Sequence, residues 1–259
     1  RRARLGFTVA PEGVHPFGTK NACVYLADGT FIEPLAVGDP ATVAAALAAG
    51  NSFVRGDHDF RAAHGEEGLS AIVLGTQDAE ADHARFARLG IAGGGMVEFS
   101  RPSFDSEGRA DIASFRLAFA AHAGASGAFF FTCERRRVPA IDRSALERHE
   151  NGATRIAAVT AVSDDPKSFA GFLAAFSEGA ASAGKDAFGV GLANAALRVL
   201  PGPAAGGTRL TAVTFGVRDL AATAALFNAA AIGYETRERA LSVPAVAEQG
   251  AEFIFEETP

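Results

Sequence analysis

Tryptophan is absent from this 259-residue sequence, and cysteine, methionine and tyrosine are scarce, with two, one and two copies. No stretch of about 18 apolar residues runs without a charge, so we expect no membrane-spanning helix. The start lacks a basic segment followed by an apolar core and a cleavage site, so the sequence predicts no signal peptide. Cys23 and Cys133 lie in apolar, strand-like runs without Cys or His at zinc-ligand spacing. A disulfide framework needs more cysteines, so we expect a reduced, cytoplasmic chain.

The sequence also has fewer basic residues (24) than acidic residues (30). The net charge is -6 and the isoelectric point is about 5.6, so we expect no basic surface for phosphate backbones and no nucleic-acid partner. Apolar residues are plentiful at 48%, with 21 phenylalanines, and they suffice for a sizeable core.

One pattern repeats along the chain. Each copy begins with a short apolar strand, continues with an Asp that can cap a helix and a run with helical spacing, and ends with a Gly. The copies span residues 69–91, 154–179 and 208–234, with Asp78, Asp164 and Asp219 as caps and Gly90, Gly179 and Gly233 as closing glycines. Strand-like segments follow each copy, so each unit reads as strand, helix and three strands.

The N-terminal segment Arg4-Leu5-Gly6-Phe7 matches only the end of this pattern. We therefore expect a further unit that lacks its leading strand and most of its helix, and the first residue is Arg1 rather than Met. The predicted fold is α+β, with four βαβββ units paired into two cup-shaped sheets. An extra helix is expected at 39–50 and a short linker helix at 142–153, where Ser144 and Glu147 have capping-box spacing. The predicted halves are residues 1–148 and 149–259.

Residues 5–37 read LGFTVAPEGVHPFGTKNACVYLADGTFIEPLAV, with a Gly-Phe strand, His-Pro, Gly-Thr-x-Asn-Ala and a strand that carries Glu. This segment resembles the glyoxalase-like domain family of the vicinal oxygen chelate superfamily. The later segments VEFSRP (97–102), FRLAF (115–119), FFFT (129–132) and HENGA (149–153) also fit, so the resemblance covers nearly the whole chain.

The resemblance implies a cup that often binds a divalent metal, with His from the first strand of a unit and Glu from the last. Glu33 matches that Glu position, while the matching His would lie before Arg1. The corresponding first strands of the other units offer no good ligand. From the residues alone, Glu33 lies in an apolar strand and needs a partner, a metal or a proton if it is buried. The alternative is an edge position beside Pro34, where the carboxylate is solvated or paired with an Arg.

Other candidate site residues surround Glu33 in the sequence. Thr19 and Asn21 share a strand face with Cys23 and Tyr25, and His15 precedes that strand. The alternative for Thr19 and Asn21 is local turn chemistry.

Three further residues are candidates for substrate binding: Arg101, Arg116 and His149. An inward Arg could hold an anionic substrate by forked hydrogen bonds, whereas Arg116 could instead pair with Glu98 or Glu134. His149 could line the rim of the cup or end a helix.

Together these features predict a small-molecule enzyme, with Glu33 and His15 as catalytic residues and Thr19, Asn21, Arg101, Arg116 and His149 as substrate contacts. What the resemblance implies is metal-dependent lyase or isomerase chemistry on a substrate with adjacent oxygens, with Glu33 as metal ligand or proton acceptor. The alternatives are a metal-free protein that sequesters a small ligand, as drug-resistance proteins do, and a structural dimerisation module. A homodimer is expected.

Overall fold

The computed structural model describes residues 3–104, 107–125, 127–203 and 207–258, and it shows the predicted α+β fold. Three units follow the order strand, helix and three strands. The first is β6 (Ala71–Thr76), α3 (Ala79–Arg88), β7 (Val97–Phe104), β8 (Ala110–Ala120) and β9 (Phe129–Arg137). The second is β10 (Ala153–Ser163), α4 (Pro166–Ser177), β11 (Ala181–Ala183), β12 (Phe188–Gly191) and β13 (Ala196–Pro201). The third is β14 (Arg209–Val217), α5 (Leu220–Ala229), β15 (Glu235–Arg237), β16 (Ala240–Val243) and β17 (Glu252–Glu257).

The leading strand of each of these units pairs in parallel with the last strand of the same unit. In the C-terminal half the two leading strands, β10 and β14, also pair with each other in an antiparallel ladder. This pairing joins both units into one eight-stranded sheet, in the order β11-β12-β13-β10-β14-β17-β16-β15.

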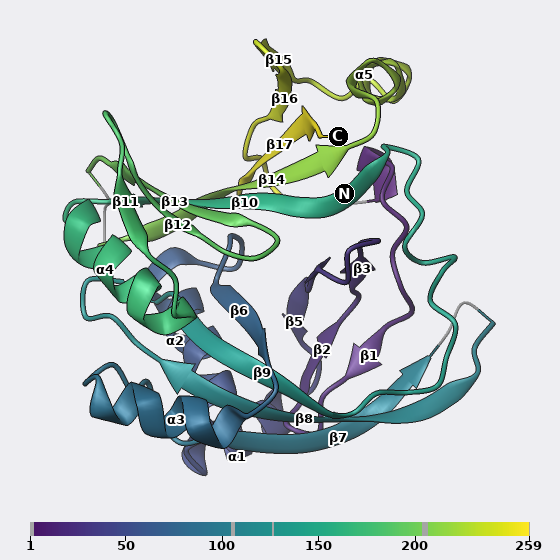
Figure 1. The fold of residues 1–259 in the computed structure, drawn as a ribbon. Helices are drawn as coiled ribbons and strands as arrows, with labels where there is room; N and C mark the ends of the chain where they lie inside the picture. The colour runs from purple at the N-terminus through teal and green to yellow at the C-terminus, as the bar shows by residue number, and fades with distance from the viewer. Residues whose placement is uncertain (1–2, 105–106, 126, 204–206, 259) are drawn as a thin grey trace.

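The N-terminal half is built differently. Its described strands form a four-stranded sheet, β6-β9-β8-β7, and two small sheets, β1-β2-β5 and β3-β4. Before β6 come the 3-10 helix η1 (Ala3–Leu5), the strands β1 (Gly13–Val14), β2 (Thr19–Asn21), β3 (Val24–Tyr25), β4 (Phe31–Ile32) and β5 (Leu35–Val37), and the helices α1 (Pro40–Ala48) and α2 (Ser52–His64). Among the described residues, β6 is the one leading strand in this half, so no pair of leading strands joins its sheets. The small strands lie between the two large sheets in Figure 1.

The local signals explain most helix starts. Asp78 and Asp219 cap α3 and α5 by accepting hydrogen bonds from Ala81 and Ala222, as predicted. The prediction of Asp164 as the cap of α4 is wrong by one residue, since the Asp165 side chain accepts the hydrogen bond from the backbone N–H of Ser168. The proline at 166 occupies the first helical position of α4, so the residue before it must be the cap.

Two other helix predictions need revision. The extra helix predicted at 39–50 is α1. A second helix, α2, follows directly and was not predicted. Asn51 caps α2, because its Oδ1 accepts hydrogen bonds from the backbone N–H groups of Phe53 and Val54. The linker helix predicted at 142–153 is wrong, because the chain forms turns at 144–147 instead. There the Asp142 carboxylate accepts from the backbone N–H of Ser144, which closes a local turn that does not propagate into a helix.

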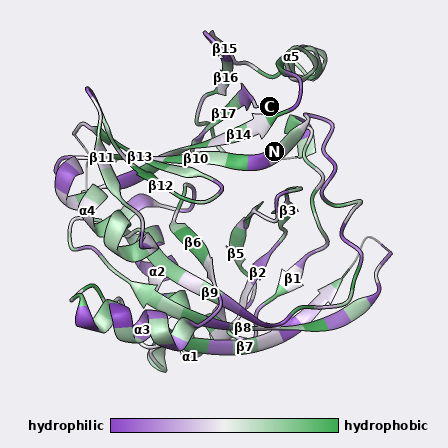
Figure 2. Cartoon of the chain, viewed as in Figure 1, coloured by the Kyte–Doolittle hydropathy of each residue, from purple (hydrophilic) through white to green (hydrophobic). Residues whose placement is uncertain are grey.

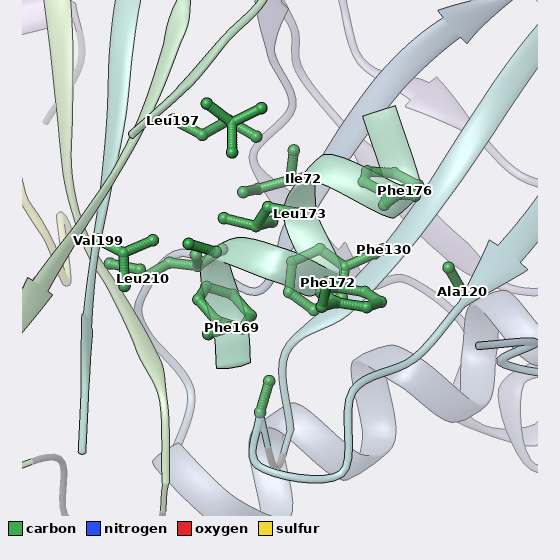
Figure 3. Close-up of a cluster of buried hydrophobic side chains, with 14 of the residues drawn as sticks. Ile72, Ala120, Phe130, Phe169, Phe172, Leu173, Phe176, Leu197, Val199 and Leu210 are labelled. Atoms are coloured by element: carbon green, nitrogen blue, oxygen red, sulfur yellow. The ribbon is translucent and has the colours of Figure 1, made fainter. Parts of the chain in front are cut away.

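The largest core cluster is shared by the two halves (Figure 3). Phe130 of β9 contacts three rings of α4, those of Phe169, Phe172 and Phe176, at centroid distances of 5.9, 5.0 and 6.0 Å. Helix α3 adds Phe86 while its opposite side carries charged residues. Figure 2 shows hydrophilic and hydrophobic segments alternating along α3, as expected for a helix that covers a sheet. No helix among the described residues is long and apolar enough to cross a membrane.

Candidate active site

Glu33 lies at an interruption of a strand, between β4 and β5. Proline at 34 has no N–H to donate, and its carbonyl accepts a 3.4 Å hydrogen bond from Ala22. The Glu33 side chain is 27% exposed, whereas the neighbouring His15 is 4% exposed. The carboxyl group therefore lies at the boundary between the protein interior and solvent.

Asn21 holds this carboxylate directly. Its Nδ2–H donates to Glu33 Oε1 at 2.6 Å, a short distance typical of a hydrogen bond to a charged acceptor. His15 Nε2 lies 3.5 Å from the same oxygen, longer than an ordinary hydrogen bond. The other ring nitrogen, Nδ1, is 2.9 Å from Thr19 Oγ1. Thr19, Asn21, His15 and Glu33 thus form one polar cluster, and the first three are buried.

The chain folds into this cluster for local reasons. A tight turn joins His15 to Thr19, where the N–H of Gly18 donates to the His15 carbonyl and the N–H of His15 donates to the Thr19 carbonyl. Gly18 has a φ of 91°, which favours glycine. Thr19 and Asn21 are two residues apart on β2, so both side chains point to the same face.

An aromatic wall surrounds the His15 ring. Phe17 stacks on it at 5.0 Å, and Phe53 and Phe99 approach at 5.5 and 5.4 Å. Phe53 comes from α2 and Phe99 from β7, so the wall joins three distant segments. Sequence analysis missed these residues. The Asn51 cap and the apolar pair Phe53-Val54 were the available signal for α2, but nothing local placed it against His15.

Burial has opposite effects on the two titratable groups. It lowers the pKa of His15 to about 3, with help from the positive charge of Arg101, so the ring is neutral at neutral pH. It raises the pKa of Glu33, against the smaller opposing effects of the Asn21 hydrogen bond and Arg101. The carboxyl group therefore takes up a proton more readily than an ordinary Glu.

Of the two candidate arginines, one lies beside the Glu33 cluster and the other does not. Arg101 lies on β7 with its Nη1 against Gly13, directly beside the Asn21 side chain. Arg116 points to the other face of the sheet, where Glu98 and Glu80 bind its guanidinium at 3.1 and 2.5 Å. The Glu98 pairing is the alternative that the sequence left open for Arg116.

The ring of His149 binds backbone groups rather than Glu33. The N–H of Thr8 donates to its Nδ1 at 3.0 Å, so Nε2 carries the proton and donates to the Tyr25 carbonyl at 2.8 Å. Both ring nitrogens are therefore engaged by backbone groups. In this position His149 ties the N-terminal segment to β3 and the linker.

The donor set for a metal is incomplete among the described residues. His15 Nε2 and Glu33 Oε1 are close enough to bind one ion, but no group of three or more His, Cys, Asp or Glu side chains forms in that part of the chain. Catalytic zinc sites use three protein ligands. The nearby charge of Arg101 also opposes a cation. The described side chains alone do not fit a bound metal, and the role of Glu33 as metal ligand stays a prediction.

His15 should make the protein sensitive to acid. Because its folded pKa lies below the unfolded value of 6.5, its contribution to stability is complete above pH 6.5 and is lost as pH falls toward about 3. Between pH 6.5 and 5 we expect a loss of about 1.5 kcal/mol in the free energy of unfolding. The raised pKa of Glu33 acts in the opposite sense, with stability lost as pH rises.

Urea unfolding of the wild type and of His15→Gln at several pH values would measure this contribution. The substitution should flatten the acid side of the pH profile. His149 also has a lowered pKa and stays in both proteins, so the difference between the two profiles isolates His15. Identical slopes below pH 6.5 would contradict the assignment.

The model of a family described as "Glyoxalase-like domain" matches residues 1–177, about two thirds of the chain. The chain belongs to the glyoxalase-like domain family. The resemblance seen in residues 5–37 is thereby confirmed. No curated protein matches this glyoxalase-like chain.

Solved structures show the same fold. A hypothetical protein from Staphylococcus aureus is similar with a TM-score of 0.68 and 14% identity, over 97% of this chain and 91% of the other. A mutant 4-hydroxymandelate synthase from Streptomyces coelicolor has a TM-score of 0.59 and 12% identity, over 97% and 87%. A xylose isomerase-like TIM barrel/4-hydroxyphenylpyruvate dioxygenase fusion protein has a TM-score of 0.57 and 14% identity, over 99% of this chain and 45% of the fusion. The glyoxalase-like chain thus has the vicinal oxygen chelate fold.

Proposed function

We propose that this glyoxalase-like protein is a small-molecule enzyme that moves a proton at a carbon next to a carbonyl, on a substrate with adjacent oxygens. The observation that carries the proposal is the Glu33 carboxyl group, which has a raised pKa, accepts a hydrogen bond from Asn21 and lies beside the aromatic cluster around His15. Membership of the family supports a small-molecule substrate. Lyase and isomerase reactions both use such a proton transfer.

Each residue of the cluster has a distinct task in this proposal. Glu33 takes the proton from carbon and returns it to the product. Asn21 orients the carboxyl group through its 2.6 Å hydrogen bond, so its amide is committed to Glu33 rather than to substrate. Neutral His15, held by Thr19, faces the same space and can hydrogen-bond a substrate oxygen. The Phe rings around His15 shield its ring from water, which strengthens a hydrogen bond made by that ring.

Deuterium exchange tests the proposal without knowledge of the natural product. Pyruvate, methyl pyruvate and dihydroxyacetone would be incubated with the full chain in D2O, and loss of the C–H signals would be followed by NMR. We expect protein-dependent exchange at carbon next to the carbonyl for at least one compound. Binding of a compound without any exchange would reject the enzyme and favour the ligand-sequestering alternative.

Metal dependence stays a separate prediction, because the described side chains alone do not complete a metal site. A divalent metal would supply Lewis-acid chemistry if further ligands completed the site. Elemental analysis of the full-length protein and of Glu33→Gln decides whether Glu33 is a ligand, since loss of a stoichiometric metal in the variant is the expected sign. The homodimer is likewise a prediction, which sedimentation at several concentrations would test.

A further inference from the structure

A small pocket lies next to the Glu33 cluster, between the β1–β3 segment and β7. Asn21, Cys23 and Tyr25 line one side, and Arg101 and Ser103 line the other. Asn21 links the pocket to Glu33, because its Nδ2 binds that carboxylate. On β7, every second residue points to the same face, so Phe99, Arg101 and Ser103 lie side by side there. Phe99 contacts the His15 ring, so the pocket adjoins the aromatic wall around His15.

Arg101 makes no ion pair with a described residue in the pocket, although its positive charge acts on the nearby Glu33 carboxyl group. Its Nη1 occupies the space that a side chain at Gly13 would fill, so the guanidinium packs directly on the β1 backbone. Its buried Nε has no hydrogen-bond partner. None of the ion pairs between described residues involves Arg101. Arg101 as a whole is half-buried, but a buried guanidinium nitrogen without a hydrogen-bond partner is costly, and an anion would offset this cost.

Arg143 approaches the same pocket from the linker. Its guanidinium lies 4.8 Å from the centre of the Tyr25 ring, and Nη2 donates to Ser103 Oγ at 3.0 Å. Its Nε is also buried without a hydrogen-bond partner. Like Arg101, it takes part in none of the ion pairs between described residues. Arg143 therefore contacts two side chains, Tyr25 and Ser103, that line the same pocket as Arg101.

The other polar groups of the pocket do not neutralise this charge. Burial raises the pKa of Cys23 and of Tyr25 to about 12, so the thiol and the phenol both keep their protons. Glu12 lies at the rim, but its carboxylate binds Lys20 Nζ at 3.0 Å. Arg101 lines the pocket, and Arg143 contacts the Tyr25 and Ser103 side chains that also line it. Two guanidinium groups thus lie beside neutral hydroxyl groups, which is the chemistry that recognises a carboxylate.

We propose that Arg101 and Arg143 bind the carboxylate of an organic-acid substrate and so place the C–H carbon next to its carbonyl, such as the methyl carbon of pyruvate, at Glu33. This inference rests on the proposed function for the assignment of the ligand as substrate. It narrows the substrate class from molecules with adjacent oxygens to small organic acids of that kind. The narrow pocket suits one terminal anionic group rather than a whole molecule.

Pyruvate binding to the full chain tests the site independently of turnover. NMR line broadening of the pyruvate methyl signal gives the dissociation constant. We expect Arg101→Gln and Arg143→Gln each to raise it at least tenfold, and Arg198→Gln, a change at an exposed position on β13, to leave it unchanged. Methyl pyruvate, which has no charge, should not compete. A second measurement needs no variant and so does not depend on whether a variant folds. In the wild type, the Nε–H signals of Arg101 and Arg143 should shift on addition of pyruvate.

Three results would overturn the inference: no pyruvate binding, equal affinity in the folded Arg101→Gln and Arg143→Gln variants, or equal binding of the neutral ester. The outcome also separates the two proposals. Exchange that is as fast on neutral compounds as on pyruvate would reject the carboxylate site and keep the proposed function. Arginine-dependent binding of pyruvate without exchange of any compound would support the anion site and reject proton transfer at Glu33.

Discussion

Glu33→Gln is expected to slow protein-dependent deuterium exchange about 100- to 10,000-fold, the range that general acid–base catalysis contributes. The amide has nearly the same size as the carboxyl group but cannot take up a proton at neutral pH. Its oxygen can still accept the hydrogen bond from Asn21, so the geometry of the cluster should persist. The measurement is the exchange rate at saturating compound, together with the binding constant.

Two comparisons make this result specific. Glu80→Gln removes a carboxylate on α3 that is 63% exposed and should leave the exchange rate unchanged. The binding constant of the substrate should change less than the rate in Glu33→Gln, because the lost interaction matters most in the transition state. A variant that keeps more than half of the wild-type exchange rate would show that another group accepts the proton.

Phe130→Ala is expected to lower the free energy of unfolding by about 3–5 kcal/mol, as large-to-small changes at buried aromatic positions do. Phe130 is fully buried on β9 and contacts three rings of α4. The loss combines the transfer of its ring from water with the cavity left between the halves. Because most small domains have a total stability of only about 5–15 kcal/mol, this single change should remove a large part of it.

Urea unfolding followed by far-UV circular dichroism measures this loss. Phe104→Ala is the matched control, since that ring is 37% exposed and its removal should cost below about 1 kcal/mol. A loss of the same size in both variants would mean that the interface between the halves adds no stability beyond ordinary surface packing.

The sequence predicted the fold well where each signal was local and repeated. An Asp before an apolar helical run marks α3 and α5, and the neighbouring Asp165 marks α4. The prediction of a linker helix failed because the capping-box spacing of Ser144 and Glu147 marks only a possible helix start. No apolar face follows to stabilise a helix there. Helix α2 was missed because its surface is mostly polar.

The candidate site was predictable only within one segment. Alternation along β2 groups Thr19 with Asn21, and chain proximity adds His15 and Glu33. Alternation cannot say which face of a sheet is covered, so Arg101 and Arg116 looked equivalent until the packing separated them. Arg143 carried no signal at all, because its place beside Tyr25 depends on the path of the linker across the N-terminal strands.

The shared aromatic cluster also bears on how the chain is made. During synthesis β9 leaves the ribosome before α4, so Phe130 stays uncovered until about residue 177 has emerged. A fragment that stops at the predicted boundary of residue 148 would display this ring to chaperones and to other chains. The match to the family model ends at residue 177, the last residue of α4. The cover of Phe130 is therefore completed by α4, beyond the predicted boundary between the halves.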